Sequence, residues 1–194
     1  MFPSHKPKRI EPLSKKLFIT GDYYSVELVV DNAMLGLELF RRYHTRKYPE
    51  IYITWLESVQ VNIAVFSRLV QLDLWQIRPP EDGLRALYYV NTSIIIVCFA
   101  IDVPSSLDDV ENFWIDEIKR FTTTRDGWTP PIILVGNRKE VRLEWELGTE
   151  KLVSVEQGQE MAKRIGAAIY LECSSRTGEG VDDVFHHAAR LCLR

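Results

Sequence analysis

Residues 93–101 read SIIIVCFAI and residues 132–136 read IILVG, and both stretches are continuous apolar runs. A strand with one face in water alternates apolar and polar residues, whereas a strand covered on both faces does not. The two runs are therefore predicted to be interior strands of a parallel sheet. Residues 106–121 lie between them and have apolar residues at helical spacing, which predicts the helix that connects two parallel strands.

This connecting helix is predicted to begin at a cap formed by Ser105 or Ser106, directly after Pro104. Six apolar side chains are predicted to point inward from it: Leu107, Val110, Phe113, Trp114, Ile118 and Phe121.

Strands and helices alternate on both sides of this unit. Four further strands are predicted, at residues 17–20, 61–66, 70–75 and 168–172. Three further helices are predicted, at residues 26–40, 155–166 and 181–193. The strands at 61–66 and 70–75 are expected to be antiparallel, because only the short link at Ser67-Arg68 separates them. The chain is therefore predicted to adopt a three-layer α/β fold, a six-stranded, mostly parallel sheet flanked by about five helices.

Length and composition limit the class of protein. The chain has 194 residues, which suits one domain, and its 46% hydrophobic and 26% charged residues exclude a disordered chain. A net charge of −3 gives no electrostatic reason to expect a nucleic-acid partner. Three cysteines without a CxxC pair indicate a reduced, cytoplasmic protein. Residues 1–15 carry three prolines and are predicted to be a flexible N-terminal arm, with residues 16–194 as the folded domain.

Motifs in the second half carry a family resemblance. LVGNRKEVR (134–142) and YLECSSRTGEGVDDVF (170–185) resemble the NKxD and CSAKTGEGV-type motifs of Rho-type members of the Ras superfamily of small GTPases. Residues 94–121 are similar to the family segment CFSIDSPDSLxNVxxKW. YPEIYITWLES (48–58) and VQLDLWQIRPPED (70–82) resemble the two switch segments, FPEVYVPTVFEN and VELALWDTAGQED. The resemblance spans residues 16–193 and implies the small-GTPase fold.

On the guanine side, the family motifs persist in conservative form. Asn137 and Ser174 are kept, Arg138 and Arg176 replace lysines, Glu140 replaces the base-reading aspartate and Ser175 replaces alanine. The resemblance implies that any residual guanine nucleotide is held by these six residues: Asn137, Arg138, Glu140, Ser174, Ser175 and Arg176. The alternative is that the residues of the two loops resemble the family motifs because they are needed for packing within the fold, and not for nucleotide binding.

On the phosphate side, the sequence departs from the family. Backbone N–H groups of a GxxxxGK[ST] loop surround phosphate, while its lysine neutralises charge and its hydroxyl holds magnesium, but no GK[ST] occurs in this sequence. One alignment starts the loop in KKLFITGD (15–22), which places Tyr23 and Tyr24 in the phosphate pocket and Glu27 at the lysine position. The other uses residues 26–30 as the strand and 31–36 as the loop. Both lose the lysine and the hydroxyl, so we expect no catalytic residue and no metal site.

The second switch is altered as well. In the position of DTAGQ, Gln76 replaces the magnesium-linked aspartate, Pro79 replaces the phosphate-sensing glycine and Pro80 replaces the glutamine that orients water. Proline has no N–H to donate to a terminal phosphate, so this segment is expected not to switch. Protein partners would then bind one interaction surface whose conformation does not change with the nucleotide. This surface comprises Thr54, Trp55, Glu57, Gln76, Arg78, Pro79 and Pro80.

The sequence thus predicts a catalytically inactive, Rho-like pseudo-GTPase that acts through protein–protein interaction in small-GTPase-type signalling, with little or no nucleotide binding. The alternative is an atypical Rho-like small GTPase that still binds GTP or GDP through the guanine-side loops and hydrolyses it slowly or not at all. No cofactor is expected in the first case, and GTP or GDP without magnesium in the second. Protein partners and a cytoplasmic location are expected, with membrane contact only through an anchor outside this sequence.

Overall fold

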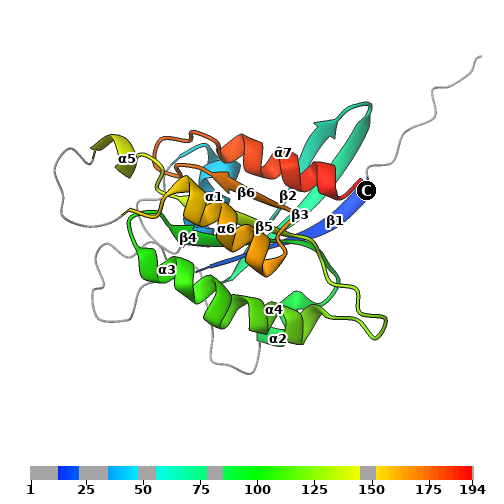
Figure 1. The fold of residues 1–194 in the computed structure, drawn as a ribbon. Helices are drawn as coiled ribbons and strands as arrows, with labels where there is room; N and C mark the ends of the chain where they lie inside the picture. The colour runs from blue at the N-terminus through cyan, green and yellow to red at the C-terminus, as the bar shows by residue number, and fades with distance from the viewer. Residues whose placement is uncertain (1–12, 22–34, 48–55, 78–84, 145–151, 194) are drawn as a thin grey trace, which may run out of the picture.

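The computed structural model of the chain describes residues 13–21, 35–47, 56–77, 85–144 and 152–193. Its six strands form one sheet in the order β2-β3-β1-β4-β5-β6 (Figure 1). The strands are β1 (Leu13–Gly21), β2 (Leu56–Val65), β3 (Arg68–Ile77), β4 (Thr92–Ala100), β5 (Ile132–Asn137) and β6 (Ile169–Glu172). Only the β2–β3 pair of this sheet is antiparallel, so the predicted α/β fold with a six-stranded, mostly parallel sheet is confirmed.

Helices cover both faces of the sheet (Figure 1). The first face packs against α1 (Leu35–Thr45) and α7 (Val181–Leu191). The second face packs against α2 (Arg85–Tyr89), α3 (Pro104–Asp109), the π-helical turn η1 (Val110–Trp114), α4 (Ile115–Thr122) and α6 (Val155–Ile165). A short helix, α5 (Val141–Glu144), follows β5. Within the described segments, no helix is both long and apolar enough to cross a membrane.

The apolar run at residues 93–101 forms the centre of the core. Its strand, β4, lies between β1 and β5, and all of its residues from Ile94 to Ala100 are buried. Ile94, Ile96 and Cys98 face α1 and α7, whereas the alternate residues face the second helix layer. Because both faces are covered by apolar groups, the continuous run needs no polar alternation.

Three local predictions were wrong. β1 begins at Leu13, so residues 13–15 belong to the sheet and not to the arm. The hairpin turn is Phe66-Ser67, one residue earlier than predicted, because Val65 pairs with Arg68. The helix after β4 begins at Pro104 with Val103 as its N-cap residue.

The predicted cap, Ser106, has a different role in the structure. Its side chain is fully buried, and its Oγ accepts a hydrogen bond from the backbone N–H of Ala100 (2.9 Å) and donates to the carbonyl of Val103 (2.6 Å). Ser106 therefore fastens the start of the helix to the end of β4.

Phe113, predicted to point inward, is 46% exposed. The cause is the π-helical turn, which leaves Val110, Trp114 and Ile118 to form the buried stripe at four-residue spacing. Phe113 remains at the surface, with its ring edge-on to Trp114 at a centroid distance of 4.9 Å.

The hairpin turn supplies a stability prediction. Phe66 has φ +53°, a left-handed conformation that costs a bulky L-residue about 1 kcal/mol, and its side chain is 91% exposed. Asparagine tolerates this conformation, so Phe66→Asn is expected to raise the free energy of unfolding by about 0.5–1 kcal/mol in urea titrations. Phe66→Ala lacks the short polar side chain that hydrogen-bonds locally in this conformation, and should change the free energy by less than about 0.5 kcal/mol. An asparagine variant no more stable than the alanine variant would contradict the assignment of strain.

Candidate functional site

Two loops meet at the carboxyl edge of the sheet, one after β5 and one after β6. Asn137, the last residue of β5, is fully buried, and its Oδ1 accepts hydrogen bonds from the backbone N–H (3.0 Å) and Oγ (3.1 Å) of Ser175. The same oxygen accepts from the backbone N–H of Arg138 at 2.8 Å. One side chain thus joins both loops.

The loop after β6 is held by its own backbone and side-chain hydrogen bonds. Ser174 is fully buried, its Oγ accepts from the N–H of Thr177 (2.9 Å), and its carbonyl accepts from the N–H of Gly178 (2.8 Å). Gly180 has φ +72°, and a Cβ there would lie 2.6 Å from the carbonyl oxygen of Glu172. Only glycine fits this close approach, so the motif sequence specifies the shape of the loop.

The loop after β5 uses its two cationic residues in ion pairs. Arg138 has φ +66°, and its Nη1 lies 3.0 Å from Oδ2 of Asp102, with both side chains 22% exposed. Lys139 donates its backbone N–H to the carbonyl of Cys173 (3.0 Å), and its ammonium pairs with Glu179. These contacts bind the loop to the turn that follows β4 and to the neighbouring loop.

Glu140 is the unusual group of this edge. It is 8% exposed, and its Oε2 is buried without a hydrogen-bond partner among the residues that the structure describes. Buried polar atoms are nearly always paired, because leaving a buried acceptor without a donor costs free energy. Among the described residues, Oε2 of Glu140 is therefore a buried acceptor whose hydrogen-bonding capacity is unused.

Five of the six guanine-side residues thus lie in the two adjoining loops with buried or half-buried side chains, and Arg176 is exposed.

Of the predicted interaction surface, Glu57 of β2 pairs with Gln76 of β3 in the hairpin. The remaining members of that surface, Thr54, Trp55, Arg78, Pro79 and Pro80, lie outside the described residues. Both alternatives for the phosphate loop, including Tyr23, Tyr24 and Glu27, lie outside them too. The described part of the chain contains no group of three or more potential metal ligands.

A network beneath the two loops was missed in the sequence. Arg142 donates from Nη2 to the carbonyl of Val153 (2.6 Å) and pairs with Glu172 (2.7 Å), which also accepts from the hydroxyl of Tyr170 (2.7 Å). A Cβ on Gly158 would lie 2.2 Å from the Tyr170 ring, and one on Gly136 would lie 2.8 Å from its hydroxyl. Glycines inside a predicted helix and a buried strand were the available signal, because they mark close approach of another group.

Comparisons with known proteins agree with this geometry. An open α/β sheet that gathers its loops at the carboxyl ends of parallel strands is typical of nucleotide-binding domains. The model of the Ras family matches residues 28–194, and the GTP-binding protein RHO1 of Candida albicans is 40% identical over 156 residues, or 76% of each chain. The chain belongs to the Ras family of small GTPases, and the similarity to RHO1 supports a Rho-type member.

The network predicts a specific response to alkaline pH. Burial, followed by the hydrogen bond to Glu172, raises the pKa of Tyr170 above its ordinary value of 10.0. Above about pH 10 the unfolded chain therefore loses this proton while the folded chain keeps it, so unfolding becomes more favourable as pH rises.

We expect Tyr170→Phe to be about 1 kcal/mol less stable than the native protein near pH 8, because one hydrogen bond is lost. The stability difference between the two proteins should shrink above about pH 10, where only the native protein carries this titration. Urea titrations from about pH 8 to 11 measure it, and a constant difference would show that Tyr170 titrates normally.

Proposed function

We propose that this chain is a Rho-type small GTPase that still binds guanine nucleotide through the loops after β5 and β6, does not hydrolyse GTP, and acts through protein contacts. The observation that carries the proposal is the buried Oε2 of Glu140, which has no hydrogen-bond partner among the described residues and lies in the loops that Asn137 holds in place. A cytoplasmic location, with membrane contact only at the periphery, is part of the same proposal.

The chemistry of Glu140 favours guanine over other bases. Guanine presents two adjacent donors, N1–H and the exocyclic amine, on one edge, and a carboxylate accepts both in charge-assisted hydrogen bonds. Adenine lacks this pair of donors. A site built around a buried acceptor therefore favours guanine, because guanine supplies the missing donors whereas adenine leaves the acceptor as it is in the free protein.

The phosphate side is expected to contribute little. A lysine facing phosphate is worth about 4 kcal/mol at 4 Å and an effective dielectric constant of 20, and a glutamate there reverses the sign. Nanomolar binding corresponds to about −12 kcal/mol, so losing this attraction and the magnesium ion reduces the affinity to about the millimolar range. Gln76, Pro79 and Pro80 also replace the groups that act in hydrolysis, so GTP turnover is expected to be absent.

A second candidate is a pseudo-GTPase that binds no nucleotide. The observation in its favour is that hydrogen bonds and ion pairs within the protein hold the two loops, including the Asn137–Ser175 contacts and the Arg138–Asp102 pair. Loops held in this way keep their shape without a ligand. The family motifs would then persist for packing alone.

Calorimetric titration with guanosine and adenosine separates the candidates. The proposal predicts that guanosine binds with a Kd of about 1 mM and adenosine at least about tenfold more weakly. Glu140→Gln removes the charge with little change in size, and should weaken guanosine binding by about tenfold or more. The matched control is Glu160→Gln, at an exposed position on α6, which should bind guanosine as the native protein does.

Binding of neither nucleoside at about 10 mM would favour the nucleotide-free candidate. Equal binding of guanosine by the Glu140→Gln variant would show that Glu140 does not read the base. Phosphate release from GTP should match the buffer alone, and turnover by the purified protein would contradict the proposed loss of hydrolysis.

A further inference from the structure

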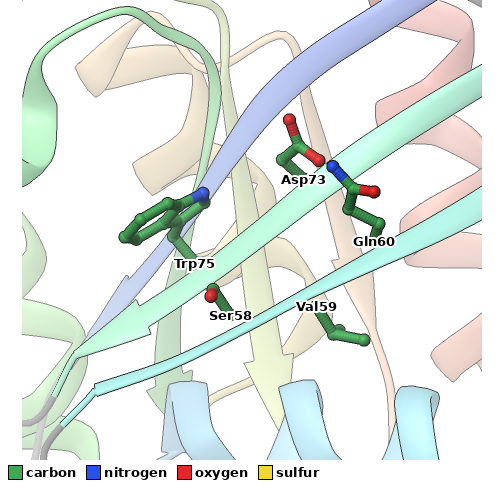
Figure 2. Close-up of a pocket in the computed structure, with 5 residues that line it drawn as sticks. All are labelled: Ser58, Val59, Gln60, Asp73 and Trp75. Atoms are coloured by element: carbon green, nitrogen blue, oxygen red, sulfur yellow. The ribbon is translucent and has the colours of Figure 1, made fainter.

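A second site lies on the β2–β3 hairpin, away from the two loops. A pocket of about 330 Å³ is lined by Ser58, Val59 and Gln60 of β2 and by Asp73 and Trp75 of β3 (Figure 2). Ser58 and Gln60 are exposed, whereas Asp73 and Trp75 are half-buried. The volume is at the lower end of the range for ligand pockets, which suits a single side chain.

Asp73 gives the pocket its chemical character. Its Oδ2 accepts a hydrogen bond from Ser14 Oγ at 3.2 Å, but its Oδ1 is buried and has no hydrogen-bond partner among the described residues. Lys16 is its neighbour on β1, yet the Lys16 ammonium donates to the carbonyls of Tyr88 (2.6 Å) and Val90 (3.1 Å). The carboxylate of Asp73 therefore keeps an acceptor that no group of the described chain satisfies.

The other lining groups complement a planar cation. Figure 2 shows the Asp73 carboxylate and the Gln60 amide pointing toward one another from adjacent strands, with Ser58 and Trp75 further along the hairpin. An indole ring accommodates the alkyl stem of a long cationic side chain, and Trp75 already has Lys16 Nζ 4.9 Å from its ring centroid. The Asp73 carboxylate and the Ser58 hydroxyl are acceptors for the several N–H donors of a guanidinium group, which lie in one plane, unlike those of an ammonium group.

This carboxylate is not part of the motif that the chain shares with its family. In the alignment of VQLDLW (70–75) with the family segment VELALW, Asp73 stands where that segment has alanine. The pocket also adjoins the interaction surface, because its Ser58–Trp75 pair directly follows the Glu57–Gln76 pair of the hairpin.

We propose that this pocket binds an arginine side chain presented by a partner protein, with the guanidinium donating to the Asp73 carboxylate and the alkyl stem lying against Trp75. The proposal depends on the proposed function only in that the domain acts through protein contacts. Charge complementarity at Asp73 selects a cation, and the two parallel N–H bonds that a guanidinium group can donate to one carboxylate favour arginine over lysine.

A two-dimensional NMR titration of the ¹⁵N-labelled full chain tests this proposal. The probe is N-acetylarginine amide, compared with the citrulline derivative, which has the same shape without charge, and with the lysine derivative. The Trp75 indole N–H signal, assigned with Trp75→Phe, should shift and saturate with a Kd in about the millimolar range for arginine. The citrulline and lysine derivatives should bind at least about tenfold more weakly.

Two variants remove the carboxylate: Asp73→Asn, and Asp73→Ala, which introduces the residue of the aligned segment. Both should keep a folded spectrum and bind the arginine probe at least about tenfold more weakly. Asp116→Asn, at an exposed position on α4, is the matched control and should bind as the native protein does.

Absence of a shift at about 50 mM arginine probe, or equal shifts with citrulline or in folded Asp73 variants, would overturn the proposal. Equal binding of the lysine derivative would overturn the assignment to arginine. The titration contains no nucleotide, so its result is independent of the guanosine experiment, and either proposal can fail while the other stands.

Discussion

The hydrogen bonds accepted by the side-chain oxygen of Asn137 hold together the edge of the domain on which the proposed function depends. This buried oxygen receives donors from Arg138 and Ser175, and so fixes the loop after β5 against the loop after β6. Its removal would leave buried donors unpaired, at a cost of about 1–3 kcal/mol for each. The Arg138–Asp102 pair and the close approach at Gly180 then complete a frame that does not require a ligand.

These internal contacts explain how the guanine side of a small-GTPase site can keep its structure when the sequence of the phosphate side changes. The guanine side is held by contacts within the protein, so it persists even if phosphate binding is lost. The phosphate side of a small GTPase instead depends on a lysine, a hydroxyl and backbone donors directed at the ligand. In this sequence GK[ST] does not occur, and Pro79 and Pro80 stand in the second switch. Under the proposed function, we expect such a domain to present the same binding surface to its protein partners whichever nucleotide is present.

Much of the fold could be predicted from the sequence because its signals are local. The apolar run of β4 identifies an interior strand without knowledge of its neighbours, and Gly166 ends α6 in the left-handed conformation that glycine favours. The turn residues and the face of Phe113 could not be predicted. Hairpin register depends on which residues pair across the strands, and a π-helical turn changes the buried face by a single residue.

The sequence predicted where the residues of the candidate site lie along the chain, but not which polar atoms of these residues are paired. The motifs place Asn137, Glu140 and Ser175 in the right loops, but the pairing of each polar atom depends on groups distant in the sequence. The oxygens of Glu140 and Asp73 that have no partner in the described part of the chain, and the packing of Tyr170 against Gly158, become visible only in three dimensions. A charged residue in a strand pattern is ordinarily solvated, so Asp73 by itself gave no signal.

The central claim is that base recognition remains while phosphate recognition does not. Its most direct measurement is the affinity of the purified protein for guanosine, GMP, GDP and GTP, each with and without magnesium, by calorimetry under one set of conditions. We expect no phosphorylated nucleotide to bind more than about threefold more tightly than guanosine, a factor that corresponds to about 0.6 kcal/mol, and we expect magnesium to change none of the affinities. An affinity that rises by orders of magnitude from guanosine to GTP, or that depends on magnesium, would contradict it.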